Sequence, residues 1–270
     1  MDWADLLLNL VALPLWLGFR GIGVGSKVTP VRSGPATRLG CGLILLLLLG
    51  GRAWVYWRLG SESHWIPRLN LGITSIPFNS LMLHRMGIFS LCSFAVWWGT
   101  FHCGLNVVSL LTHSHRNSDP WAAWVAAQLG PFSRLPAVFK PLLPWGALTW
   151  LWLVARPHLV ASGVLLPVGQ PDREWQQGLV LGATTLLAGV TLLVPILLLH
   201  FTSLVAHLGS GRWLVFVELV ARRATWPVGW LPLTLGGANL APLLVAAGIL
   251  AGNWFAIQGL GSLFRWLEVS

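Results

Sequence analysis

The sequence predicts an all-α, polytopic membrane protein with about five transmembrane helices. Charged residues make up 9% of its 270 residues and hydrophobic residues 55%, whereas an average soluble domain is about 25% charged. Lipid offers backbone groups no hydrogen-bond partner, and the alternation typical of barrel strands is absent, so the spans must be helices. Five apolar stretches are near or above the roughly 20 residues that a crossing requires: residues 39–57, 86–112, 141–166, 178–208 and 239–260.

The N-terminal apolar run differs from these five. Residues 6–19 form a short stretch that contains Asn9 and Pro14, so the pattern favours a helix that lies in the membrane interface. Asp2 and Asp5 stand where a signal peptide carries positive charge, and no small-residue cleavage site follows. We therefore expect this segment to remain in the mature protein.

Two copies of one unit follow. In each copy a long apolar segment leads to a Trp-led stretch, then to two prolines, then to another apolar segment. The stretches begin at Trp121 and Trp213, and the proline pairs (Pro136 with Pro141, and Pro227 with Pro232) are offset by about 91 residues, as a duplicated span–loop–span unit would give. The pattern thus predicts two tandem helix–loop–helix repeats with amphipathic loop helices.

The basic residues favour a cytoplasmic N-terminus with both Trp-led loops on the cytoplasmic face. Ten fall in the loops that would then lie inside, against five outside (Arg58, Arg68, Arg85, Arg173 and Arg265). The ten are Arg20, Lys27, Arg32, Arg38, Arg116, Arg134, Lys140, Arg212, Arg222 and Arg223.

The net charge of +9 is spread over every loop and forms no dense patch, which predicts contact with anionic lipid headgroups and no binding of nucleic acid. The three cysteines, Cys41, Cys92 and Cys103, lie inside predicted spans without metal-binding or redox spacing. We expect them to be packing residues.

The loops resemble those of the YggT/YlmG family. The second copy has Asn239 where that family usually has Asp, and the first copy keeps Asp119 and Lys140 but has Leu148 and Leu151 at the positions of Asn239 and Pro242. The resemblance covers residues 86–260. The residues that form the structural loop motif are Pro136, Pro141, Pro227, Pro232, Gly236, Gly237, Asn239 and Pro242.

The resemblance implies three parts: an N-terminal extension (1–85), a first repeat (86–166) and a second repeat with the C-terminal tail (167–270). It also implies an integral protein of a bacterial inner membrane, cytoplasmic or intracytoplasmic, without enzymatic activity. Family members are linked to membrane organisation, and in photosynthetic lineages to assembly of cofactor-bearing complexes. We therefore expect a scaffold or assembly subunit that docks against other integral membrane proteins of a larger complex.

The loop helices are the predicted docking elements. Trp213, Phe216 and Val217 recur at helical spacing, and Asn239 is suited to cap the last span, because its side chain can accept a first-turn N–H. Such a helix lies on the headgroups or docks on a partner. The residues predicted to dock on lipid or partner are Trp121, Trp124, Trp213, Phe216, Val217, Arg222 and Arg223.

The histidines raise an alternative from another class. His200 and His207 are seven residues apart and would share a helix face, and His102 lies deep in a predicted span. Imidazole is the usual axial ligand of haem and could also bind chlorophyll magnesium. A haem- or chlorophyll-binding accessory subunit of a photosynthetic or electron-transfer complex is therefore the alternative function, although no cofactor is firmly predicted.

A channel or transporter for small solutes is a further alternative. The eight acidic residues (Asp2, Asp5, Glu62, Asp119, Asp172, Glu174, Glu218 and Glu268) all fall in expected loops or tails, so a proton or cation pathway lacks an acidic relay. The sequence carries no nucleophile elbow and no phosphate-binding loop, which predicts that the protein is not an enzyme and holds no metal.

Overall fold

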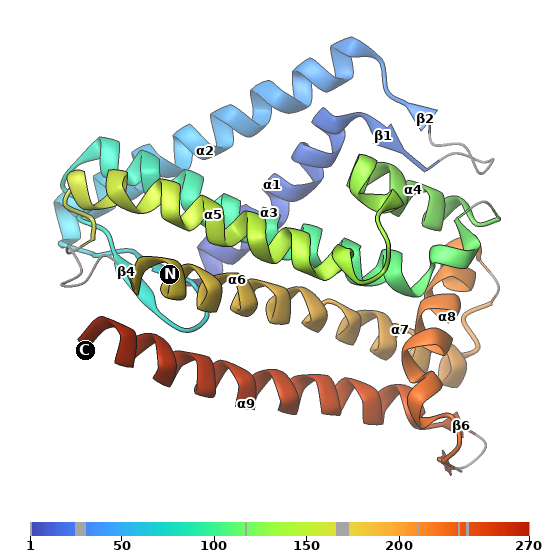
Figure 1. Cartoon of the computed structure of the whole chain (residues 1–270). Coiled ribbons are helices and arrows are strands. Elements are labelled where there is room, and N and C mark those ends of the chain that lie inside the picture. Colours follow the sequence, from blue (N-terminus) through green and yellow to red (C-terminus); the bar gives the residue numbers. More distant parts are fainter. Residues whose placement is uncertain are drawn as a thin grey trace.

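Long helices that lie side by side build this protein, whose computed structural model describes residues 2–24, 31–116, 118–165, 173–209, 211–231, 233–235 and 238–269 (Figure 1). The helices are α1 (Asp2–Arg20), α2 (Pro35–Ser63), α3 (Leu83–Leu111), α4 (Pro120–Leu129), α5 (Phe139–Ala161), α6 (Glu174–Thr191), α7 (Leu193–Ala206), α8 (Arg212–Thr225) and α9 (Ala241–Val269). Short 3-10 helices follow at η1 (His113–His115), η2 (Gly130–Arg134) and η4 (Trp226–Val228). The strands form two-stranded sheets from β1 (Ile22–Gly23) with β2 (Val31–Arg32), β3 (Arg68–Asn70) with β4 (Ser75–Pro77), and β5 (Thr234–Leu235) with β6 (Ala238–Asn239). The predicted all-α class is confirmed.

Among the described residues, five helical segments are long and apolar enough to cross a membrane: Trp3–Arg20, Pro35–Ser63, Leu83–Leu111, Glu174–Ala206, which joins α6 and α7, and Ala241–Leu267. The sequence predicts about five spans as well, but it includes α5 and leaves out α1. Residues 6–19 were predicted to be too short to cross, yet α1 is 19 residues long because the helix begins at Asp2 and continues through Pro14. The predicted span 141–166 corresponds to α5. This helix is long and apolar enough to cross only when it is joined with α4 and η2, and the chain bends by 83° between η2 and α5.

Helices α3 and α6 form the centre of the bundle. Helices α1 and α2 pack on α3, α5 packs on α3 and α6, and α9 packs on α6 and α7. Both termini lie at one end of the bundle, with β4, and the short helices α4 and α8 lie at the other (Figure 1). The order of long helix, short helix, 3-10 turn and long helix occurs twice, as α3–α4–η2–α5 and as α6/α7–α8–η4–α9. This is the order that the two-copy pattern predicts.

Side-chain caps set the start of two helices. The Asp119 carboxylate accepts the backbone N–H groups of Trp121 (2.9 Å) and Ala122 (2.8 Å) at the start of α4. The Asn239 side chain accepts the N–H of Ala241 at 2.9 Å, directly before α9. First-turn N–H groups have no partner within the helix, so these bonds fix where each helix begins. Asn239 thus accepts the N–H of the first helical residue from one position before the N-cap.

The hairpin β3–β4 was not predicted. It pairs Leu69 with Ile76, both buried, and turns at Gly72, where φ is +87°. A side chain at Gly72 would lie 2.7 Å from a methyl group of Thr184, so the tip of the hairpin presses against α6. Residues that follow the tip, including Ile73, pack with the ends of α6 and α9. The hairpin therefore closes the end of the bundle where the termini lie.

Candidate functional site

A buried arginine joins the first three helices. The Arg52 side chain of α2 is 1% exposed, and its Nη1 lies 3.2 Å from Asp5 Oδ1 of α1. The same nitrogen donates to Asn9 Oδ1 at 2.9 Å, Nε donates to Ser90 Oγ of α3 at 3.0 Å, and Nη2 donates to the Ser90 carbonyl. Every nitrogen of the guanidinium therefore has a partner. Burial of this charge inside a membrane bundle is costly without such partners.

The Asp5 carboxylate is the centre of the network. It accepts hydrogen bonds from Ser93 Oγ at 2.7 Å, from the Tyr56 hydroxyl at 3.3 Å and from Asn9 Nδ2 at 3.4 Å. The side chain is 25% exposed. The network thus neutralises the charge of Arg52 and leaves one carboxylate with limited access from outside. Asp5 had been assigned to a tail; that assignment was wrong, because α1 begins at Asp2.

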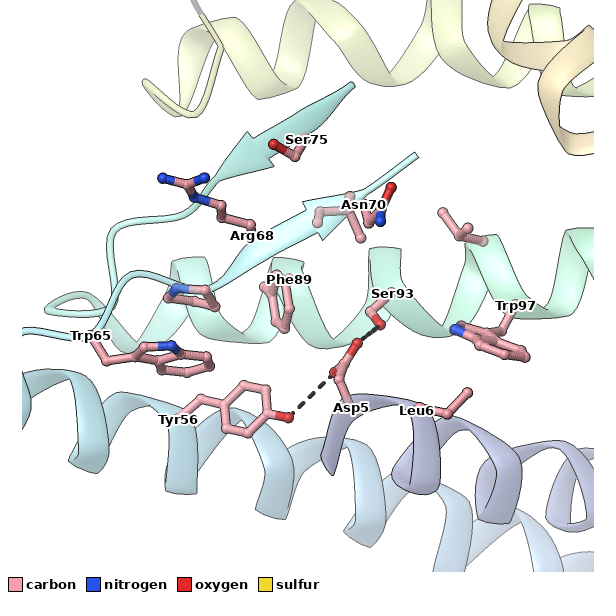
Figure 2. A pocket seen from close by; sticks show the side chains of 13 residues that line it. Asp5, Leu6, Tyr56, Trp65, Arg68, Asn70, Ser75, Phe89, Ser93 and Trp97 are labelled. Carbon is pink, nitrogen blue, oxygen red and sulfur yellow. Dashed lines mark hydrogen bonds between the residues drawn. The ribbon is translucent and has the colours of Figure 1, made fainter. Parts of the chain in front are cut away.

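A cavity of about 330 Å³ opens beside this carboxylate. In Figure 2 the Asp5 side chain points from α1 toward Ser93 and Tyr56, while Arg68 and Ser75 project from the hairpin on the opposite side. Aromatic side chains form much of its wall: Tyr56, Trp65, Phe89 and Trp97. We call this cavity the polar pocket. Nothing in the sequence analysis predicted it, although Asp5 and Asn9 lie one helical turn apart on one face of α1, and that spacing was a usable signal.

Two more basic groups are buried in the helices. Arg156 of α5, whose side chain is 3% exposed, pairs with Glu174 at the start of α6 at 2.6 Å. Lys140 Nζ lies 3.0 Å from Ser109 Oγ of α3. The assignment of all acidic residues to loops or tails is therefore wrong for Glu174 and Asp5. It is also wrong for Asp2, Glu62 and Glu268, which lie within α1, α2 and α9. Asp5 and Glu174 each neutralise a buried arginine.

Helix α4 is largely buried within the chain. Trp124 Nε1 donates to the Ile22 carbonyl at 2.8 Å, and Arg20 donates to the Gln128 carbonyl at 3.0 Å. The Trp121 ring is stacked with Phe216 of α8, with centroids 6.3 Å apart. The predicted docking residues of α4 are thus engaged with the N-terminal segment and with α8. Contact with a partner is not needed to explain them.

The remaining predicted docking residues lie on α8, where some are buried and others are exposed. Val217 is buried and Phe216 packs against the cluster between α3, α4 and α7. Trp213 is exposed, and Arg222 lies on the surface with Glu218 at 3.9 Å. Arg223 donates to Ser114 Oγ at 3.4 Å. Exposed aromatic side chains on and after α8 include Trp213, Trp226 and Trp230, and Phe132 is exposed after α4.

The prolines of the loop motif lie at helix starts and turns. The Pro136 carbonyl accepts the N–H of Phe139 at 3.0 Å, Pro141 lies in the first turn of α5, and Pro227 lies in η4. Pro242 lies in the first turn of α9, where a missing N–H costs nothing. Pro232, Gly236 and Gly237 lie outside the described residues.

The three histidines predicted as possible cofactor ligands, His102, His200 and His207, do not all lie at one site. His200 and His207 line one groove of about 360 Å³ between α7 and α8, together with Glu218. Helix α7 ends before His207, which has a φ of +51°. The two histidines therefore line the same groove, but they do not share the regular helix face that the sequence predicted. His102 lies elsewhere, its Nδ1 2.9 Å from the Trp98 carbonyl. Across the described residues, His, Cys, Asp and Glu form no group of three or more suited to a metal ion.

Helix α9 has an open side. It packs on α6 and α7 through residues such as Ala246 and Phe264, which are buried. Gly248, Gly252 and Gly259 are exposed, and a Cβ added at any of them would meet no atom within 4 Å. Gly248 and Gly252 form a short stripe one helical turn apart, and the exposed Phe255 stands between them and Gly259 along the same face.

Comparison with known proteins gives no family. No family model matches the chain. No curated protein and no solved structure matches it either. The resemblance to the YggT/YlmG family rests on the loop residues alone and stays a prediction.

Proposed function

We propose that this protein is a non-enzymatic scaffold or assembly subunit of a bacterial inner membrane, which docks other integral membrane proteins through the open side of α9. The observations that carry the proposal are that α9 has the smallest buried share of the candidate spans among the described residues, 6%, and that its exposed side carries Gly248 and Gly252 one turn apart. Small residues in transmembrane helices let a second helix approach closely, and helix association in lipid depends on such packing. The predicted role of the loop helices is reduced accordingly, since α4 packs mostly inside the chain.

The test is to fill the stripe. Gly248→Leu and Gly252→Leu should each leave the fold intact, because the new side chains enter open space. A side chain forced into a close helix contact costs about 1–3 kcal/mol, which corresponds to a roughly 5- to 150-fold loss of association. The measurement is quantitative mass spectrometry of membrane proteins that co-purify with the full chain in mild detergent.

The matched control is Ala247→Leu, an exposed position on α9 that lies off the stripe. It should retain the partners of the unaltered chain. Equal retention in all three variants would contradict docking through α9. Recovery of a second copy of this chain as the sole partner would contradict a role in a larger complex.

We infer that the end of the bundle with α4 and α8 faces the cytoplasm. The support is the ten to five excess of basic residues in the loops at that end. The C-terminal end of α1 contacts α4 through Arg20, whereas Asp5 contacts Ser93 in the N-terminal half of α3. If α1 crosses the membrane, the N-terminus lies opposite the loop helices. If α1 lies in the interface, the N-terminus and the loop helices share the cytoplasmic side, as the sequence predicts.

Reporter fusions check this orientation. A reporter inserted at Arg116 or Arg212 should give the cytoplasmic signal, and one at His64 or fused before Asp2 the opposite signal. A cytoplasmic signal from the N-terminal fusion would mean that α1 does not cross. Matching signals at Arg116 and His64 would contradict the crossing of α2 and α3 as well.

Tetrapyrrole binding is the second candidate function, and what favours it is the groove that His200 and His207 share. Asn or Gln keeps hydrogen-bonding capacity but ligates metals poorly. If the groove holds a haem or chlorophyll, His200→Gln should abolish a visible absorption band of the purified protein while partners remain bound. His102→Gln serves as the control, since His102 lies outside the groove. An identical spectrum in all three proteins would rule against this candidate.

A further inference from the structure

Two tryptophans after α8 are the most exposed large apolar side chains among the described residues. Trp226 is 80% exposed and Trp230 is 79% exposed. Trp226 keeps a helical backbone directly after α8, and the Trp230 Nε1 donates to the Pro227 carbonyl at 3.0 Å. Neither ring is covered by any described part of the chain. An exposed apolar surface of this kind marks a contact with a membrane or with a protein.

These tryptophans lie at the level of one end of α9. The last turns of α8 pack on the first turns of α9 through Ala221 and Ala246, and α8 and β6 lie together at that end of the bundle (Figure 1). Near the other end of α9, Trp266 is 60% exposed, with the Arg173 guanidinium 5.3 Å from its ring. From Ala246 to Trp266 the helix rises about 30 Å, at about 1.5 Å per residue, and this equals the thickness of the hydrocarbon core. Exposed tryptophans thus occur at both ends of α9 where a membrane has its headgroups.

Arginines stand beside the two tryptophans of α8. Arg222 precedes Trp226 by four residues and therefore lies on the same face of the helix. Its side chain is 76% exposed, and Glu218, the one acidic residue of α8, lies 3.9 Å away. An exposed ion pair holds its partners weakly, so this guanidinium can still bind a phosphate. Arg223 is also exposed, with Ser114 Oγ at 3.4 Å. Helix α8 carries three arginines against one glutamate, so its outer side suits an anionic surface.

We propose that the two tryptophans, together with Arg222 and Arg223, form a surface that binds anionic phospholipids of the adjacent leaflet. We call it the headgroup surface. The rings lie between the headgroups and set the depth of α8 in the interface. The guanidinium groups pair with lipid phosphates, which their planar donors fit well. A zwitterionic lipid offers the same phosphate but adds an ammonium group, so the arginines favour a lipid with a net negative charge. The surface is independent of docking through α9, because it includes none of the exposed glycines of that helix.

The experiment measures lipid binding to the full chain in mild detergent by native mass spectrometry. The probes are phosphatidylglycerol and phosphatidylcholine with the same acyl chains. Replacing both arginines, as Arg222→Gln with Arg223→Gln, should weaken phosphatidylglycerol binding roughly 5- to 25-fold, since each basic residue near an anionic surface contributes about a factor of 5. Phosphatidylcholine binding should fall by a smaller factor. Trp226→Ser with Trp230→Ser should weaken binding of both lipids.

Matched controls remove the same kinds of side chain elsewhere. Arg58→Gln removes an exposed arginine in the last turns of α2, where it pairs with Glu62. Trp175→Ser removes an exposed tryptophan at the start of α6. All of these side chains are exposed, so every variant should keep the far-ultraviolet circular dichroism and the unfolding midpoint of the unaltered chain.

Each outcome decides the proposal. A preference for phosphatidylglycerol that is lost in the arginine variant and kept in Arg58→Gln supports it, as does weaker binding of both lipids in the tryptophan variant but not in Trp175→Ser. Equal binding of the two lipids by the unaltered chain would overturn the selectivity for anionic lipid. Losses as large in the controls would overturn the placement at α8. Unchanged lipid binding in the tryptophan variant, together with loss of a co-purifying protein, would assign the surface to a protein partner instead.

Discussion

Replacement of Asp5 by Asn should cause one of the largest losses of stability in this chain. The change keeps the size of the side chain but removes the charge that neutralises Arg52, whose side chain is 1% exposed. Removing one partner of a buried ion pair costs about 3–5 kcal/mol, because the other charge stays buried without compensation. The measurement is reversible unfolding of the purified protein in mixed detergent micelles, followed by far-ultraviolet circular dichroism.

A double variant separates the charge from the packing. Arg52→Met alone should also destabilise, while Asp5→Asn combined with Arg52→Met should cost less than the sum of the single changes, since no buried charge remains. Glu62→Gln is the control, because Glu62 and Arg58 form an exposed pair at 3.3 Å and such pairs contribute about 0–1 kcal/mol. If Asp5→Asn cost no more than Glu62→Gln, the neutralising role of Asp5 would be refuted.

The parts of the fold that sequence predicted are those that depend on local composition. Apolar length identified α2, α3 and α9, since a membrane span needs its own run of about 20 apolar residues. The bond from the Ala241 N–H to the Asn239 side chain followed from two residues that are close in sequence, whereas the cap at Asp119 was not predicted. The repeated Trp and Pro positions predicted a short helix within each copy, and α4 and α8 lie there, while the duplication itself stays a prediction.

The polar pocket could not be predicted because its residues meet only in the folded chain. Asp5 and Arg52 are 47 residues apart, and Asp5 and Ser93 are 88 apart. A polar residue in an apolar run indicates that some partner exists, but not which one. The same limit affected Trp124, whose bond to the Ile22 carbonyl spans 102 residues. A short, largely apolar helix such as α4 shows the same pattern whether it packs on lipid, on a partner or on its own chain.

Glycines show most directly that the sequence does not reveal which residues meet in the folded chain. One of them, Gly189, gives the second large loss of stability that we expect. Gly189 of α6 and Gly248 of α9 both lie in apolar helices, yet their surroundings are opposite. A Cβ at Gly189 would lie 2.5 Å from Cys103 Cβ and 2.9 Å from the backbone nitrogen of Gly104, whereas one at Gly248 would meet nothing within 4 Å. The contact at Gly189 includes backbone of α3, so the neighbour cannot simply change rotamer. Gly189→Val should therefore force α3 and α6 apart.

The separation of α3 and α6 affects more than the contact itself, because α6 lies between α3, α5 and α9 at the centre of the bundle. Overpacking of a well-packed site typically costs about 1–3 kcal/mol, and we expect Gly189→Val to reach or exceed the upper end, since it adds a branched side chain against backbone. Thermal unfolding in detergent should show a lower midpoint for this variant. The amount of the variant found in the membrane should also fall. Gly248→Val is the matched control, which adds the same side chain in open space and should leave the midpoint unchanged. A stable Gly189→Val protein would mean that α3 and α6 do not pack this closely, and an unstable Gly248→Val protein would mean that the open side of α9 is covered by part of the chain.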